Sequence, residues 1–333
     1  MENVDLDVLA SDWRGALDAA EDTLDVLGRS CRALHFSPIE LRDRVQALAY
    51  ERQATNRGLQ ELARTTHKHL HRSMTGPRAD GELLGVGTAG ACVFDLDGIL
   101  TASAALHAAA WQDALDELLV RHYAGQRERY GPLRAFSPHT EYFRYFHGRP
   151  RLDGLRTFLA SRGIRLPEGS PGDPAGSETA FGVANSKNQA LRRRLAHAGV
   201  QAYEGSFRYL ELAHEAGLRC AVVSASANTK EILGRSGIGP LIDAIVDGNV
   251  MEAEQLRPKP EPDSVLAACN ALGAPPNAVA AFEATSAGIA ASRSAEVGRV
   301  IVVDREGRRE RAQLRAADRV VSDLTDLIDP VLG

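Results

Sequence analysis

Two aspartates two residues apart, Asp95 and Asp97, follow a short apolar run. At that spacing both carboxylates can face one crevice, so that one attacks a phosphorus atom while the other handles a proton. An isolated Asp-x-Asp pair arises often by chance. Here it is followed, in order, by Ser224 after a second apolar run, Lys259 in a Lys-Pro pair and Glu283 after a third run. Because a hydroxyl and an ammonium group can hold phosphoryl oxygens as charge develops, the ordered set predicts phosphoryl transfer.

Carboxylates next to an anionic substrate repel it unless a cation intervenes. Mg²⁺ is the natural companion of such a site, since it binds through one or two carboxylates and the phosphate oxygens of the substrate. The sequence therefore predicts Mg²⁺ as the cofactor.

Short apolar runs alternate with helical stretches after residue 90, which is the pattern of βαβ units and a mostly parallel, Rossmann-like α/β sheet with helices on both faces. The predicted strands are Cys92–Asp95, Cys220–Ser224, Val279–Glu283, Arg299–Val303 and Arg319–Ser322. In such sheets ligands bind outside the carboxyl ends of the strands, which is where the candidate residues fall.

The first two predicted strands are too far apart for a simple crossover, so the sequence between them predicts an inserted helical domain. Its helical stretches are Ala104–Val120, Gly154–Arg162 and Ser186–Ala198. The Gly-rich stretch 73–90 reads as a linker. We expect a helical cap at 103–199, the linker and first part of the core at 76–102, and the remainder of the core at 200–333.

In residues 1–75 apolar residues recur at spacings of three and four, a pattern that predicts a separate helical hairpin. Residues 1–36 carry a net charge of −5 and residues 37–79 a net charge of +4, which favours pairing of the two helices. We expect this hairpin to serve as a packing extension, or as a handle for a homodimer or a partner protein.

The bulk composition limits the function. The chain has 333 residues and a net charge of −5, which argues against a general nucleic-acid binder. It has no apolar run of membrane-spanning length, and its acidic N-terminus lacks the pattern of a signal peptide. A cytoplasmic enzyme that binds neither nucleic acid nor membrane is expected.

Five stretches carry a family resemblance: VFDLDGILTASAALHAAAWQDAL, FHGRPRLDGLRTFLASRGIRLPEGSP, AVVSASANTKEIL, RPKPEPDSVLAACNALG and AFEATSAGIAAS. They resemble the haloacid dehalogenase superfamily of phosphohydrolases and phosphomutases, and within it the β-phosphoglucomutase-like group. The similarity covers about residues 90–330.

The resemblance implies roles for the first motif residues. Asp95 aligns with the nucleophile that forms an aspartyl-phosphate, and Asp97 with the general acid/base. Ser224 and Lys259 align with the pair that holds the phosphoryl group. Mg²⁺ would bind Asp95, the backbone carbonyl of Asp97 and the acids after the third strand, of which Glu283 is present.

The predicted cap also matches the mutases. His107 aligns with a hinge histidine, and Arg151 with an arginine that grips the distal phosphate of the substrate, for which its planar fork is suited. Ser226 and Asn228 align with residues that contact the same phosphate. These positions imply a phosphorylated sugar, although each residue also has a plain structural explanation as a turn, helix or surface residue. Trp111 is most simply a core residue of the cap.

One departure weakens the resemblance: Ala284 follows Glu283 where the family usually has a second acid. We expect weaker Mg²⁺ binding as a result. Three functions follow from the sequence. The first is interconversion of β-glucose 1-phosphate and glucose 6-phosphate through an aspartyl-phosphate. The second is a sugar-phosphate phosphatase. The third is a catalytically weakened relative with a binding or regulatory role.

Overall fold

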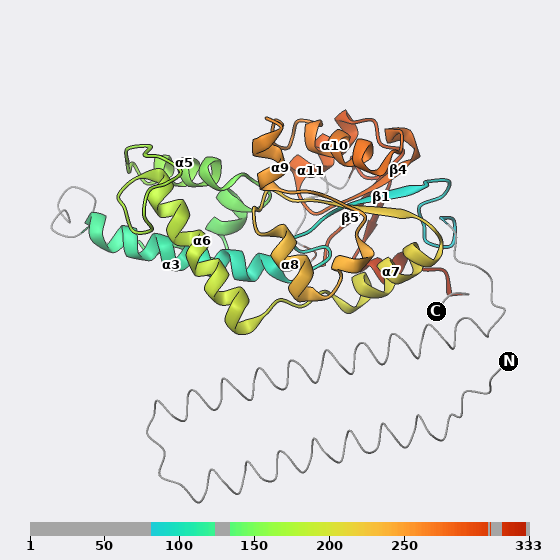
Figure 1. The fold of residues 1–333 in the computed structure, drawn as a ribbon, viewed down its shortest axis with the longest axis horizontal. Helices are drawn as coiled ribbons and strands as arrows, with labels where there is room; N and C mark the ends of the chain where they lie inside the picture. The colour runs from blue at the N-terminus through green and yellow to red at the C-terminus, as the bar shows by residue number, and fades with distance from the viewer. Residues whose placement is uncertain (1–80, 124–133, 306, 308–314, 331–333) are drawn as a thin grey trace, which may run out of the picture. The chain divides into compact units, whose positions relative to one another are not determined.

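The computed structural model describes residues 81–123, 134–305, 307 and 315–330 (Figure 1). The predicted N-terminal hairpin and the first part of the predicted linker lie outside these residues. Among the described residues, no helix has the length and apolar character needed to cross a membrane.

A single six-stranded parallel sheet forms the centre of the described fold. Its strands are β1 (Ala91–Asp95), β2 (Arg219–Val223), β3 (Ala244–Val246), β4 (Val279–Glu283), β5 (Arg299–Val303) and β6 (Arg319–Val321). They lie in the order β3-β2-β1-β4-β5-β6, so β1 is a central strand. The Rossmann-like prediction is therefore confirmed. All five predicted strands are present, and β3 is one that the sequence patterns did not predict.

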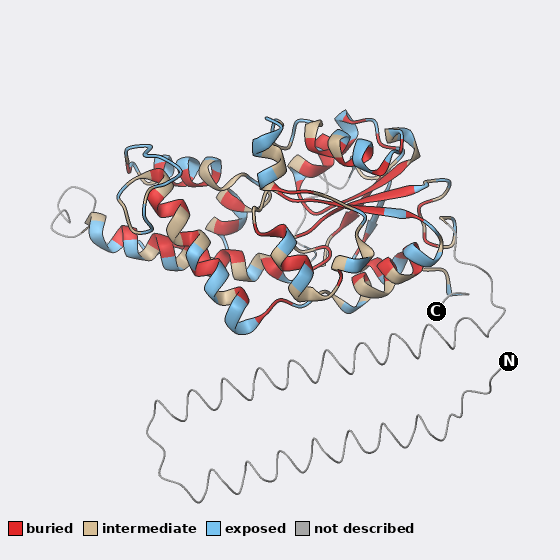
Figure 2. Ribbon diagram, in the orientation of Figure 1, coloured by how far each residue is buried: buried red, intermediate tan, exposed pale blue. Residues whose placement is uncertain are grey.

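Helices cover both faces of the sheet, and its central strands are buried (Figure 2). Because successive side chains of a strand point to opposite faces, each central strand contributes to two apolar clusters. Cys92 and Phe94 of β1 contribute to one apolar cluster, which α7 (Glu204–Glu215) and α8 (Thr229–Ser236) complete. Ala91 and Val93 contribute to the other, beneath α10 (Asp263–Leu272) and α11 (Ser286–Ser294), with α9 (Gly248–Ala253) alongside. Strands buried on both faces explain the nearly continuous apolar runs in the sequence.

The insertion between β1 and β2 has its own apolar core, in which Trp111, Phe146 and Phe158 lie together. Its elements are α3 (Ser103–Tyr123), the π-helical turn η1 (Tyr142–Phe146), α5 (Arg151–Ser161) and α6 (Ala180–Ala198). The three predicted helices are present, each beginning earlier than expected. Figure 1 shows these helices gathered beside the sheet, as expected of a cap.

Residues 81–90, in the stretch that reads as a linker, pack closely against the core. Leu84 and Val86 are buried in the same cluster as Phe94. Tyr209 of α7 donates a hydrogen bond to the carbonyl of Leu84, at 2.9 Å. The small residues of this segment therefore form a tight turn before β1 rather than a free tether.

Candidate functional site

A cavity between the cap and the carboxyl ends of β1 and β2 brings the predicted residues together. All eight predicted catalytic and substrate-binding residues line it: Asp95, Asp97, His107, Arg151, Ser224, Ser226, Asn228 and Lys259. Glu283, the remaining predicted metal ligand, is not among the lining residues. Residues spread over 165 positions of the chain thus meet in one place because parallel strands end at the same edge of the sheet.

Asp95 ends the central strand β1 and faces this cavity with only 7% of its surface exposed. The ammonium group of Lys259 lies 3.7 Å from its Oδ1 atom. In a buried setting this neighbouring positive charge offsets the repulsion between the carboxylate and an anionic substrate. Asp95 is therefore a cavity-facing carboxylate whose charge is partly balanced by Lys259.

Asp97 is held from the first residue of the cap helix α3. The hydroxyl of Ser103 donates to its Oδ1 atom, and Ser103 in turn lies 2.7 Å from the hydroxyl of Thr101. The Nε2 atom of His107 is 3.9 Å from the same carboxylate oxygen. The side chain of Asp97 is thus fixed on one side by the hinge of the cap and open on the other to the cavity.

Lys259 is shared between two acids. Its Nζ atom donates to both oxygens of Glu283, at 3.1 and 2.9 Å, in addition to facing Asp95. Burial alone would lower the pKa of Lys259, but the charges of Asp95 and Glu283 outweigh it and raise the pKa. The pKa of Glu283 is also raised, chiefly by burial. Lys259 acts in the opposite direction but compensates for burial only in part, because Asp95 adds a second negative charge. Lys259 is therefore a permanent cation at the floor of the site.

The side chain of Glu283 folds back over the first turn of α11. Its Oε1 atom accepts a hydrogen bond from Ser292, and a Cβ atom at Gly288 would clash with Oε2. Gly288 therefore permits the close approach that puts Glu283, only 1% exposed, against Lys259. In this arrangement Glu283 orients the lysine.

The loop after β2 carries the two serines and Asn228. The hydroxyl of Ser224 accepts from the backbone N–H of Ser226, and the hydroxyl of Ser226 accepts from that of Asn228. The amide group of Asn228 bridges to the cap, donating to Asn188 at 2.7 Å and accepting from Arg192 at 3.4 Å. Asn228 thus joins the core to the cap beside the cavity that it lines.

Lys187 is a site residue that the sequence patterns did not identify. It comes from α6, lines the cavity and is only 5% exposed. Its Nζ atom lies 2.9 Å from Nδ1 of His107, and its charge lies over the ring of Trp111. Burial lowers the pKa of Lys187 to about 8, although Asp97 acts in the opposite direction. The sequence did contain one signal for it: Lys187 lies at helical spacing from Val183, Ala184 and Ala190, so it falls on the apolar face of the helix.

His107 is neutral in this setting. Burial lowers its pKa well below the usual value, and the charges of Lys187 and His147 lower it further. Since Lys187 donates to Nδ1, the ring proton belongs on Nε2, which faces Asp97. His107 therefore links the cap lysine to the acid/base candidate.

The cap contributes two arginines: Arg149 lies in the loop that follows η1, and Arg151 is the first residue of α5. Arg149 and Arg151 both line the cavity, and neither forms an ion pair within the described part of the chain. Together with Lys187 they make the cap side of the cavity cationic, opposite Asp95 and Asp97. A ligand with an anionic group at the end remote from the aspartates would match this distribution of charge.

Comparison with known proteins identifies the family. A family model for haloacid dehalogenase-like hydrolases matches residues 89–296. A curated β-phosphoglucomutase from Mycobacterium bovis is 43% identical over 241 residues, which cover 72% of this chain and 91% of the relative. The chain belongs to the haloacid dehalogenase-like hydrolases. The resemblance seen in the motifs is therefore confirmed.

Solved structures of this family share the fold. The structure of CbbY from Rhodobacter sphaeroides in complex with phosphate has a TM-score of 0.54 and 24% identity, and covers 72% of this chain and 96% of its own. That of β-phosphoglucomutase from Clostridium difficile has a TM-score of 0.54 and 22% identity, with coverage of 72% and 93%. These similarities support the sheet and cap architecture described above.

The haloacid dehalogenase-like site of this chain has a reduced set of metal donors. Ala284, where the resemblance led us to expect a second acid, offers no donor and is buried, with 3% of its surface exposed. Glu283 is engaged by Lys259 and Ser292. In the described residues no group of three or more His, Cys, Asp or Glu side chains could hold a metal ion. Asp95 and Asp97 both line the cavity, and the carboxylate of Asp95 with the backbone carbonyl of Asp97 would meet the lower limit of what Mg²⁺ uses.

Proposed function

We propose that this protein transfers phosphoryl groups on sugar phosphates through an aspartyl-phosphate on Asp95, as a phosphomutase of the β-phosphoglucomutase type. The observation that supports it best is the composition of the cavity between the cap and the sheet. Its floor holds Asp95, Asp97 and Lys259, and its cap side holds Lys187 and the two arginines. A molecule with phosphate groups at both ends fits such a cavity better than a simple phosphoester does.

In the first half-reaction an oxygen of Asp95 attacks phosphorus and the bond from phosphorus to the sugar oxygen breaks. Asp97 gives its proton to the departing oxygen. In the second half-reaction Asp97 takes a proton from another hydroxyl of the sugar, which attacks the phosphoryl group and restores the carboxylate of Asp95. The hydroxyl of Ser224 and the ammonium of Lys259 hold the phosphoryl oxygens during both steps.

Mg²⁺, when bound at Asp95 and the backbone of Asp97, would neutralise charge on the transferring phosphoryl group. Glu283 is proposed to assist through Lys259 or, with a change of side-chain position, as a ligand. The cap residues have a separate task. Arg151, Ser226 and Asn228 would bind the distal phosphate, and closure of the cap would exclude water from the aspartyl-phosphate.

The second candidate is a sugar-phosphate phosphatase. It uses the same aspartates, with water as the acceptor in the second step. The match to a hydrolase family model favours it, and the two functions differ only in what reaches the phosphoenzyme. A binding or regulatory role is the third candidate, for which Ala284 is the supporting residue.

One experiment separates the three candidates. The purified protein is incubated with Mg²⁺, β-glucose 1-phosphate and a trace of glucose 1,6-bisphosphate, while glucose 6-phosphate and free phosphate are followed together. We expect glucose 6-phosphate from the wild type and none from Asp95→Asn. Free phosphate in its place would favour the phosphatase, and no product across a panel of sugar phosphates and metals would refute both enzymatic proposals.

A further inference from the structure

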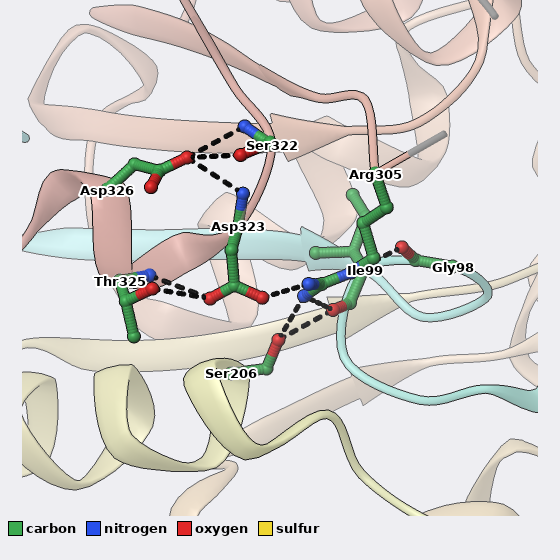
Figure 3. A network of polar contacts seen from close by, with 8 residues as sticks. All are labelled: Gly98, Ile99, Ser206, Arg305, Ser322, Asp323, Thr325 and Asp326. Carbon is green, nitrogen blue, oxygen red and sulfur yellow. Dashed lines mark hydrogen bonds and ion pairs between the residues drawn. The ribbon is translucent and has the colours of Figure 1, made fainter. Parts of the chain in front are cut away.

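A half-buried arginine contacts the turn that directly follows Asp97 (Figure 3). Arg305 follows the carboxyl end of β5, and 15% of its side chain is exposed. Its Nε atom donates to the carbonyl of Gly98 at 3.2 Å, and its Nη2 atom to the carbonyl of Ile99 at 2.9 Å. These are the two peptide carbonyls that directly follow Asp97 in the chain.

The guanidinium group is itself fixed on every side. Its Nη1 atom pairs with Asp323, its Nη2 atom also donates to the hydroxyl of Ser206 at 2.8 Å, and its plane lies 3.9 Å over the ring of Tyr203. Asp323 is held in turn by the backbone N–H and the hydroxyl of Thr325, each at 2.9 Å. Figure 3 shows Arg305, which follows β5, between the turn after β1, Ser206 of α7 and Asp323 after β6.

The hydrogen bonds within the turn use the carbonyls of Leu96 and Thr101, and leave the carbonyls of Gly98 and Ile99 to accept from other parts of the chain. Gly98 adopts a φ of +84°, and its N–H donates to the carbonyl of Thr101 at 3.0 Å. The N–H groups of Leu100 and Thr101 both point to Leu96. The carbonyls of Gly98 and Ile99 therefore face outward, and Arg305 and Ser206 are the donors that fix these two peptide planes.

We propose that Arg305 is a positioning residue for Asp97. Its guanidinium group donates to two consecutive carbonyls and so fixes the turn. The orientation of the turn sets the direction in which the carboxylate and the backbone of Asp97 face the cavity. A lysine could not replace it, because a single ammonium group cannot match two carbonyls, a hydroxyl and a carboxylate at once. The inference rests on the proposed phosphoryl transfer for its effect on rate, but not for its effect on the turn.

The effect on rate follows from geometry. A displacement of about 1 Å at a catalytic group can lower turnover by about 100-fold without removing any group that binds substrate. We therefore expect Arg305→Ala to lower kcat by about 10- to 100-fold while KM stays within about twofold of the wild type. Arg305→Lys should recover little of this loss, and Asp323→Asn should show a smaller one.

A matched control lies at the other end of the same strand. Arg299 begins β5 and donates to the carbonyl of Gly85 at 2.8 Å, so it also ties a loop to the sheet through a guanidinium–carbonyl contact. That loop precedes β1 and carries none of the site residues. Arg299→Ala should therefore cost stability without a loss of kcat. Methylguanidinium added to Arg305→Ala should restore turnover, because it fills the vacated space with the same fork, whereas methylammonium should not.

Hydrogen exchange tests the inference independently of activity. We expect amide exchange in residues 96–101 to rise at least about tenfold in Arg305→Ala and to be unchanged in Arg299→Ala, since fixed peptide planes keep these amides bonded. Unchanged exchange of this turn in Arg305→Ala would overturn the inference. So would an active wild type whose kcat is unaffected in Arg305→Ala. If the wild type transfers no phosphoryl group, the proposed function fails and the exchange measurement alone decides the role of Arg305.

Discussion

Replacement of Lys187 by methionine should make the protein more stable and less able to bind its substrate. The pKa of about 8 for this buried lysine, against 10.5 for an ordinary one, means that the folded state disfavours its charge. That difference corresponds to roughly 3 kcal/mol when the lysine is charged. Methionine has a similar length and would pack against Trp111 without a charge. We expect a gain of about 1–3 kcal/mol in the free energy of unfolding at pH 7.

The stability difference should depend on pH, because Lys187 holds its proton less tightly in the folded state than in the unfolded state. Between pH 8 and 10.5 the unfolded chain binds a proton at Lys187 that the folded protein does not, so wild-type stability contributed by this group rises with pH over that range. The advantage of Lys187→Met should be complete below about pH 8 and should disappear by about pH 10.5.

Urea unfolding of the two proteins at several pH values measures this advantage directly. Lys230→Met, at an exposed position of α8, is the matched control and should change stability little. KM for a sugar phosphate should rise about tenfold or more in Lys187→Met, because a charged hydrogen-bond donor is lost from the cavity. A variant that is less stable at pH 7, or whose advantage is the same at pH 10, would refute the reasoning.

Two further substitutions test the turn after β4, one within it at Ala284 and one at Gly148 of the cap, which lies against Thr285. Ala284→Asp should lower the Mg²⁺ concentration needed for half-maximal activity by about tenfold. Without the metal it should lower the free energy of unfolding by about 1–3 kcal/mol, because it buries a carboxylate. Titration of activity and of Tm with Mg²⁺ measures the two effects, and Ala290→Asp at an exposed site is the control. Gly148→Ala should lower kcat/KM because a Cβ atom there would lie 2.9 Å from Thr285 across the cap–core contact. Gly163→Ala has a similar φ but open space, so equal losses in both glycine variants would show that backbone strain, not cap closure, is responsible.

The sheet was predictable because its strands are buried on both faces and read as apolar runs. β4 and β5 have the predicted bounds. β3 was missed because it has only three residues, Ala244–Val246, and sits at the edge of the sheet, where burial leaves little pattern. Of the predicted linker 73–90, the described part at 81–90 packs against the core, which the sequence did not indicate because small residues suit a tight turn as well as a tether.

The placement of the site followed from strand order, and all eight predicted catalytic and substrate-binding residues line one cavity. The side-chain contacts within the site could not be predicted from the sequence. Whether Glu283 faces a metal or Lys259 depends on a side-chain position that only the packing against Gly288 decides. The contact of Arg305 with the Asp97 turn joins residues 206 positions apart, with no spacing that a sequence could display.

The most direct test of the central claim is to look for the phosphoryl group on Asp95. The protein is mixed with glucose 1,6-bisphosphate and Mg²⁺, quenched in acid within milliseconds to seconds, digested and analysed by mass spectrometry. We predict one phosphoryl group on the peptide that contains Asp95, labile to hydroxylamine as an acyl phosphate is, and absent from Asp95→Asn. Turnover of the sugar phosphate without any adduct at Asp95, or with an adduct on another residue, would contradict the account.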